Sequence, residues 1–201
     1  MGMILEGIVT TLAESGEVNI APMGPLAEPD MQRLIFRPFQ TSTTFRNLQR
    51  TGQGVFHVTD DVELLARAAV SRLTPLPPLQ PAADVEGQIL SGCCRWYAFR
   101  VETLDASGPL AHIETRVVSQ GRFRDFYGFN RAKHAVLEAA ILATRLHILP
   151  ADEVHGELNR LLPLVEKTAG RAEVAAFQFL QNYIAEFYAS ASPDSERPSL
   201  H

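Results

Sequence analysis

The sequence predicts a mainly β protein: a barrel of small strands, about 125 residues long, followed by a helical subdomain. Short β-rich runs joined by tight turns occupy the first part of the chain, and no strand–helix–strand rhythm appears there. From Asn130 the pattern changes to long amphipathic helices. We therefore expect a β-barrel over residues 1–128, a helical subdomain over 129–190 and a flexible tail over 191–201.

The barrel strands are expected where β-branched and aromatic residues cluster between turn residues. These segments are Leu5–Leu12, Val18–Ala21, Leu34–Arg37, Val55–Val58, Trp96–Glu102 and Ala111–Ser119. The turn at Ser15 and Gly16 favours a hairpin of the first two. Residues 44–51 are typical of a short helix with a Ser or Thr cap and Gly52 as its stop. The proline-rich residues 74–84 predict a rigid surface excursion.

Three helices are expected in the second part of the chain. The first, Arg131–Ile148, places Ala132, Val136, Ala139, Ala143 and Leu146 on one face. The second covers about Asp152–Thr168, where Pro163 should kink or restart the helix. The third is Arg171–Ala189, separated from the second by Gly170.

Composition argues against two classes of partner. A net charge of −5 and a pI near 5.7 disfavour general nucleic-acid binding, which needs a basic face. No apolar run approaches the roughly 18–20 residues that cross a bilayer. The two cysteines, Cys93 and Cys94, are adjacent and suit no structural disulfide, so we expect a packed pair on a strand and a reducing cytoplasm.

Two polar segments interrupt the apolar pattern of the barrel. In residues 41–47, Ser42, Thr43 and Thr44 bring three hydroxyls to a helix start, and Arg46 and Asn47 follow. Hydroxyls, free backbone N–H groups and a guanidinium at a helix N-terminus favour a phosphate site. The alternative is an ordinary helix cap with a solvated arginine.

The other polar segment, residues 19–24, follows the second expected strand. Pro22 and Gly24 lie just past the strand end, where backbone donors and acceptors could meet a flat polar ring. A plain turn after a strand explains the same pattern.

Taken together, the two segments resemble a known family in their order and spacing. The similarity is carried by Ile8-Val9-Thr10-Thr11, Gly16-Glu17-Val18-Asn19-Ile20-Ala21-Pro22-Met23, Phe36-Arg37, Thr43-Thr44-Phe45-Arg46-Asn47-Leu48 and Thr51-Gly52-Gln53-Gly54-Val55-Phe56-His57-Val58. Over roughly residues 5–125 the chain is similar to the flavin reductase-like FMN-binding split barrels. Residues 129–141 and the three helices resemble an uncharacterised branch of that class, which has a helical subdomain and no assigned substrate.

The resemblance implies a split β-barrel that binds FMN and forms a homodimer, with FMN near the subunit interface. The ring would lie against Asn19, Ala21, Pro22 and Met23. The phosphate would be surrounded by Ser42, Thr43, Thr44 and Asn47, with Arg46 as its charge partner.

A basic cluster begins the first expected helix of the second part. Arg131, Lys133 and His134 follow Arg122 and Arg124 closely in the sequence. Cations oppose the dipole at a helix start, so we predict that Arg131 and Lys133 contact an anion, either the FMN phosphate or an acidic substrate. The alternative is a solvated first turn.

The resemblance implies an FMN-binding flavoprotein that acts as an oxidoreductase, in which flavin N5 would exchange a hydride with an unidentified small molecule. No side chain is nominated as catalytic, and the six histidines show no metal-ligand spacing. Two other functions stay open. One is a non-enzymatic flavin carrier or sensor, and the other is a binding protein for another anionic metabolite, pterin-like or phosphorylated.

Overall fold

The computed structural model describes residues 2–191, with side chains through Ser190, and the chain forms two compact units that meet in sequence between Gly128 and Phe129. The elements in chain order are β1 Met3–Ile4, β2 Ile8–Leu12, β3 Val18–Pro22, β4 Leu26–Ala27, β5 Arg33–Phe36, α1 Thr43–Thr51, β6 Gln53–Val58, α2 Val62–Ala69, β7 Leu79–Pro81, β8 Gln88–Leu90, β9 Arg95–Asp105, β10 His112–Arg122, α3 Arg131–Ala143, α4 Ala151–Thr168 and α5 Arg171–Ala191.

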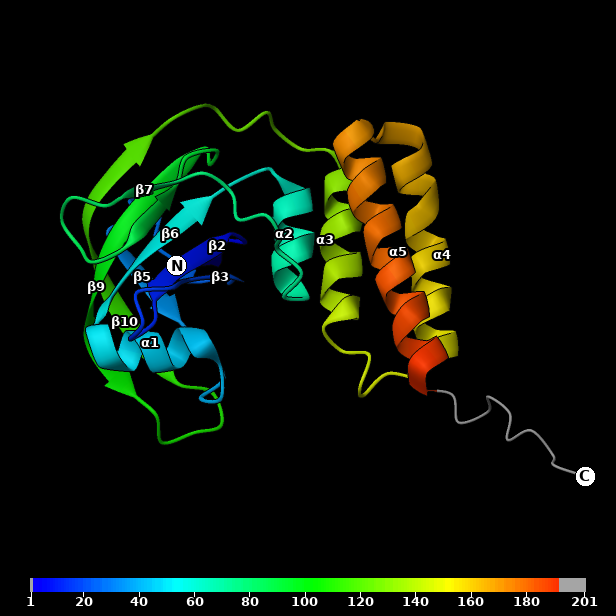
Figure 1. The fold of residues 1–201 in the computed structure, drawn as a ribbon. Coiled ribbons are helices and arrows are strands. Elements are labelled where there is room, and N and C mark those ends of the chain that lie inside the picture. The colour runs from blue at the N-terminus through cyan, green and yellow to red at the C-terminus, as the bar shows by residue number, and fades with distance from the viewer. Residues whose placement is uncertain (1, 192–201) are drawn as a thin grey trace, which may run out of the picture. The chain divides into compact units, whose positions relative to one another are not determined.

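The first unit is built on one eight-stranded antiparallel sheet that curls into a half-barrel (Figure 1). The strand order is β1-β4-β5-β10-β9-β6-β2-β3. The long strands β9 and β10 pair along most of their length at the centre of the sheet. Among the described strands β1 and β3 are the edges, so the barrel is split and not closed. The predicted mainly β fold with a split barrel followed by helices is confirmed.

Aromatic side chains fill the concave interior. The Phe36 ring lies 4.9 Å from that of Phe99 and 6.3 Å from that of Phe56, measured between centroids. Helix α1 closes this core by burying Phe45 and Leu48 against it. The helix is therefore held by its apolar face, which leaves its first turn available for other contacts.

A two-stranded sheet of β7 and β8 packs on the other face of the barrel sheet. The fully buried His57 of β6 joins the two layers. Its Nδ1 lies 3.1 Å from the carbonyl oxygen of Ile8, and its Nε2 accepts the N–H of Leu90 at 3.1 Å. The expected proline-rich excursion is thus partly wrong, because it contains strand β7.

Helices α3, α4 and α5 lie side by side in the second unit (Figure 1). The predicted apolar face of α3 is buried throughout, although the helix ends at Ala143, earlier than expected. Helix α4 continues through Pro163, where a kink or a restart was predicted, so the helix does not restart there. Pro163 and Asn159 are both exposed, so water can bind the carbonyl that lacks a helical partner.

The tail predicted over 191–201 lies, apart from Ala191, outside the described residues. Within the described part of the chain, no helix has the length and apolar character needed to cross a membrane.

Candidate functional site

Helix α1 begins with a complete cap. Ser42 has extended backbone geometry, and its Oγ accepts the N–H of Phe45 at 3.1 Å. The N–H of Arg46 is bonded to the carbonyl of Ser42. The first four N–H groups of a helix have no helical partner, so those of Thr43 and Thr44 remain for a ligand. The first turn contains no acidic residue.

Arg46 holds its guanidinium over this helix start. Nη1 donates to the carbonyl of Thr41 at 3.0 Å, and Nη2 donates to Oγ1 of Thr43 at 3.1 Å. All three residues are exposed. Among the described residues no carboxylate forms an ion pair with Arg46. A cation, a hydroxyl and two free N–H groups therefore converge at the positive end of α1, which is an arrangement suited to a phosphate.

The two polar segments meet behind this surface. Asn19 of β3 donates from Nδ2 to Oγ1 of Thr44 at 3.0 Å and to Oγ1 of Thr11 at 3.3 Å. Asn47 of α1 donates from Nδ2 to the same Thr11 oxygen at 2.9 Å. Thr11, Thr44 and Asn47 are buried, so these side chains support the site from within the protein.

Strand β3 is an open edge whose register decides which backbone groups are free. At one end of the β2–β3 hairpin the Met23 N–H donates to the carbonyl of Gly7, and at the other end the Ala13 N–H donates to the carbonyl of Glu17. The pairing of β2 with β3 between these two bonds has no register shift. Bonded pairs alternate in an antiparallel ladder, so Asn19 and Ala21 use their backbone groups on β2. The N–H and C=O of Ile20 point to the open edge.

Ile20 is therefore added as a candidate, although the sequence prediction nominated only its neighbours Asn19 and Ala21. The hairpin register is the signal that identifies it, and a sequence alone does not fix that register. Pro22 pairs with Ile8 in a non-bonded position, so its missing N–H costs no ladder bond. Met23 is partly buried and packs against the barrel core.

A cavity of about 270 Å³ runs along the outer side of β3. It is lined by Glu17, Val18, Asn19, Ile20, Ala68, Ser71, Leu73 and Leu76. Small-molecule sites usually occupy about 300–1,000 Å³, so this cavity could hold part of a cofactor. It adds apolar side chains from the segment after α2 to the polar edge of β3.

Arg131 and Lys133 lie in the helical unit. Arg131 is exposed on the first turn of α3. Lys133 Nζ lies 3.7 Å from Oε1 of Glu173, whose Oε2 accepts the N–H of Gly170. This ion pair joins α3 to α5 and offsets the cation at the helix start. Contact of Arg131 and Lys133 with an anionic ligand stays a prediction.

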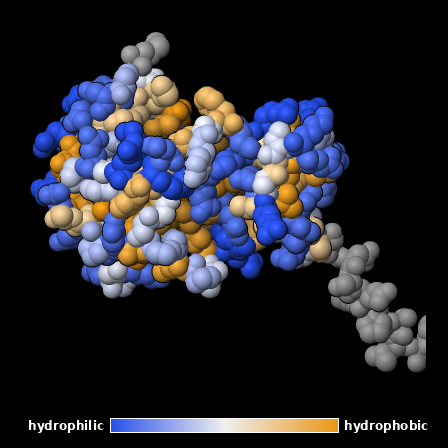
Figure 2. Space-filling model, turned by 90° about the horizontal axis from the view of Figure 1, so that it is seen from above, coloured by the Kyte–Doolittle hydropathy of each residue, from blue (hydrophilic) through white to orange (hydrophobic). Residues whose placement is uncertain are grey.

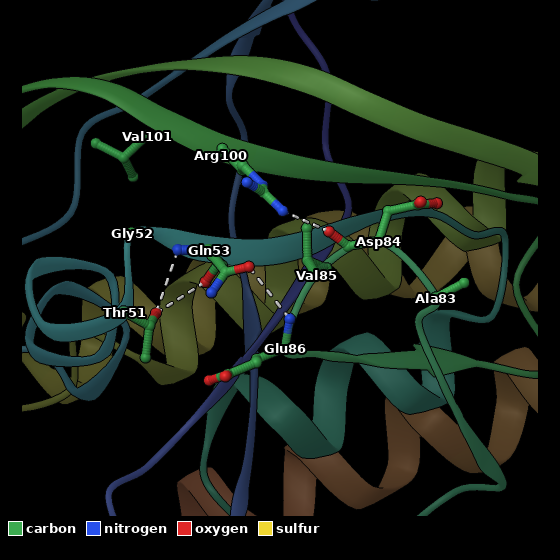
Figure 3. A pocket seen from close by; sticks show the side chains of 9 residues that line it. All are labelled: Thr51, Gly52, Gln53, Ala83, Asp84, Val85, Glu86, Arg100 and Val101. Atoms are coloured by element: carbon green, nitrogen blue, oxygen red, sulfur yellow. Dashed lines mark hydrogen bonds between the residues drawn. The ribbon is translucent and has the colours of Figure 1, made fainter.

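A larger cavity, of about 620 Å³, opens at the opposite end of α1 (Figure 3). Arg100 donates to the carbonyl of Asp84 at 3.0 Å, and Glu86 N–H donates to Oε1 of Gln53 at 3.3 Å. Two carboxylates and the negative end of a helix disfavour a phosphate here. We therefore place the phosphate end of the candidate site at the start of α1, whose first turn contains no acidic residue.

Cys93 and Cys94 are both buried, directly before β9 and not on it as predicted. Burial raises the pKa of the Cys93 thiol to about 12. Reactive thiols require an accessible thiolate, so this pair serves packing.

Two family models match the chain, both described as protein of unknown function DUF447: the N-terminal domain over residues 5–123 and a second domain over residues 130–182. The chain belongs to the DUF447 family. No curated protein matches the sequence.

Several solved structures have a fold similar to that of this chain. An FMN-bound DUF447 protein of Methanosarcina mazei superposes with a TM-score of 0.78 at 23% identity, over 91% of this chain and 96% of that one. The 2-nitrobenzoate 2-nitroreductase of Pseudomonas fluorescens superposes with a TM-score of 0.52 at 15% identity, over 61% of this chain and 66% of that one. Flavoredoxin of Methanosarcina acetivorans superposes with a TM-score of 0.52 at 8% identity, over 60% of this chain and 69% of that one. These likenesses establish a flavin reductase-like fold.

Proposed function

We propose that this protein binds FMN non-covalently between the start of α1 and the open edge of β3. The observation that carries the proposal is the helix start itself, where Thr43 and Arg46 are exposed, the N–H groups of Thr43 and Thr44 have no helical partner, and the first turn contains no acidic residue. The fold it shares with an FMN-bound protein of the same family supports the choice of ligand.

The residues present fit the two ends of FMN. The phosphate would be held by the N–H groups of Thr43 and Thr44, by the Thr43 hydroxyl and by Arg46. The polar rim of the ring needs donors and acceptors along a straight edge, which the free N–H and C=O of Ile20 and the carbonyl of Pro22 offer. Thr44, Asn47 and Asn19 hold these two parts together.

We further propose an oxidoreductase. Bound FMN supplies a hydride acceptor or donor at ring nitrogen N5. The chain binds and orients the ring and excludes water through the apolar side chains beside β3, and no side chain needs to act as a catalytic acid. The reacting partner would be a small molecule.

Reduction of the bound flavin tests this activity. The protein is loaded with FMN, desalted and mixed anaerobically with NADH or NADPH while absorbance near 450 nm is followed; we expect bleaching within roughly seconds to minutes, as for flavin enzymes of ordinary turnover. A yellow protein inert to both nicotinamides would favour a carrier or sensor. A colourless protein that ignores FMN would favour another anionic metabolite.

We also propose a homodimer. Met3, Ile4 and Phe39 are 64%, 66% and 67% exposed, although they are large and apolar. Hydrophobic side chains interrupt the hydrophilic surface of the barrel unit in Figure 2. Contiguous exposed apolar groups are typical of interfaces, and Met3 and Ile4 are neighbours on the edge strand β1. Light scattering after size exclusion is expected to give twice the chain mass of 22.2 kDa. A single chain mass at every concentration would contradict the dimer.

A further inference from the structure

Thr11 joins the two parts of the candidate site but belongs to neither. We propose that it is a positioning residue that fixes the spacing between the edge of β3 and the start of α1. In this way it couples the ring end of the FMN site to its phosphate end. This role rests on the FMN binding proposed above.

The fully buried Thr11 hydroxyl lies between two side-chain amides, one from β3 and one from α1. It accepts the Nδ2–H groups of Asn19 at 3.3 Å and of Asn47 at 2.9 Å. A hydroxyl oxygen has two acceptor sites, and these two amides use both. Asn19 in turn reaches Thr44 at 3.0 Å, so strand and helix are joined through a closed network.

Few other polar contacts could replace this link. Among the described residues three side-chain hydrogen bonds join α1 to the β2–β3 hairpin: Asn19 to Thr44, Asn47 to Thr11, and Arg50 to the carbonyl of Leu12. Arg50 lies in the last turn of α1, far from the phosphate end. Apolar packing of Phe45 and Leu48 holds the helix on the barrel, and the polar link between its first turn and the hairpin runs through the network that contains Thr11.

The neighbouring Thr10 provides a matched control. It is equally buried and lies on the same strand, but its side chain points to the opposite face and donates to the carbonyl of Gln88. Replacing either threonine with valine removes one buried hydroxyl of the same shape. Only the Thr11 change touches the network between β3 and α1.

Coupling between the ring end and the phosphate end of the site can be distinguished from a general loss of stability by comparing two ligands. FMN uses both ends of the site, whereas riboflavin lacks the phosphate and uses the ring end alone. When the spacing is lost, the phosphate can no longer reach its donors while the ring is in place. The ratio of FMN affinity to riboflavin affinity should then fall, whereas a merely weakened fold would lower both affinities together.

The experiment compares wild type, Thr11→Val, Thr11→Ser and Thr10→Val by quenching of FMN and riboflavin fluorescence. Thr11→Val is expected to lower the FMN-to-riboflavin affinity ratio about tenfold, the value of one buried hydrogen-bonded link. Thr11→Ser restores the hydroxyl and should keep the wild-type ratio, as should Thr10→Val. If Thr11→Val does not fold, Thr11→Ala removes the same hydroxyl and carries the same expectation.

An unchanged ratio in Thr11→Val, or an equal fall in Thr10→Val, would overturn the positioning role while leaving FMN binding intact. Absence of FMN binding by wild type would overturn both proposals together. The two failures are therefore distinguishable in one set of titrations.

Discussion

Acidification from pH 7 to pH 5 is expected to lower the free energy of unfolding by roughly 2 kcal/mol through His57 alone, approaching 3 kcal/mol at pH 4. His57 is buried and neutral, and it holds Ile8 and Leu90 through its two ring nitrogens. Burial lowers its pKa from 6.5 to about 4. Protonation would also convert the acceptor of the Leu90 N–H into a donor.

The direction of this pH effect on stability follows from the lowered pKa of His57. In the unfolded chain the imidazole binds its proton near pH 6.5, but the folded protein keeps it neutral until about pH 4. The stabilisation is therefore complete above pH 6.5 and is lost as the pH falls through this range.

Chemical denaturation at pH 7, 6 and 5 measures the effect, and His57→Gln is its control. Glutamine can donate to the Ile8 carbonyl and accept from Leu90, but it does not titrate. The slope of stability against pH should be shallower in His57→Gln than in wild type. Identical slopes would show that another group carries the acid sensitivity.

Changing the exposed part of the helix start should weaken FMN binding by about 10- to 100-fold, because charge-assisted hydrogen bonds to the phosphate are lost. The variant combines Thr43→Val with Arg46→Gln. Both side chains are exposed, so the fold should be preserved. Thr44 is left unchanged because it is buried against Asn19, and its loss would disturb β3 as well.

Riboflavin affinity and Arg50→Gln serve as the controls. Riboflavin has no phosphate and should bind the double variant as it binds wild type. Arg50 lies on the same helix at the opposite end, where it donates to the carbonyl of Leu12, so its replacement removes one positive charge and that bond while leaving the proposed phosphate donors in place. Equal losses of FMN affinity in the double variant and Arg50→Gln would indicate a general charge effect and refute the phosphate assignment.

Much of the fold could be predicted because local sequence signals were consistent. The cap at Ser42 and the left-handed Gly52 delimit α1 as expected, and the apolar face of α3 is buried throughout. The failures are tertiary. Helix α4 does not restart at Pro163, whose position is exposed, and β7 forms within a proline-rich stretch because β8 pairs with it.

The segments of the candidate site could be nominated from the sequence, but which of their side chains turn inward could not. Hydroxyl and amide residues identified the segment at the start of α1, yet Thr44 and Asn47 turn inward, and Thr43 and Arg46 remain outside. Thr11 and Ile20 were not nominated from the sequence because their proposed roles come from pairing with β3 and from the position of that strand at an edge. Such relations arise only when the sheet is assembled.

The most direct test of the central claim is a titration of dialysed wild-type protein with FMN, followed by quenching of flavin fluorescence. We predict saturable binding of one FMN per chain with a Kd of about 1 µM or tighter. Absence of saturation up to roughly 1 mM FMN would contradict the claim, and the start of α1 would then have to serve another anionic ligand.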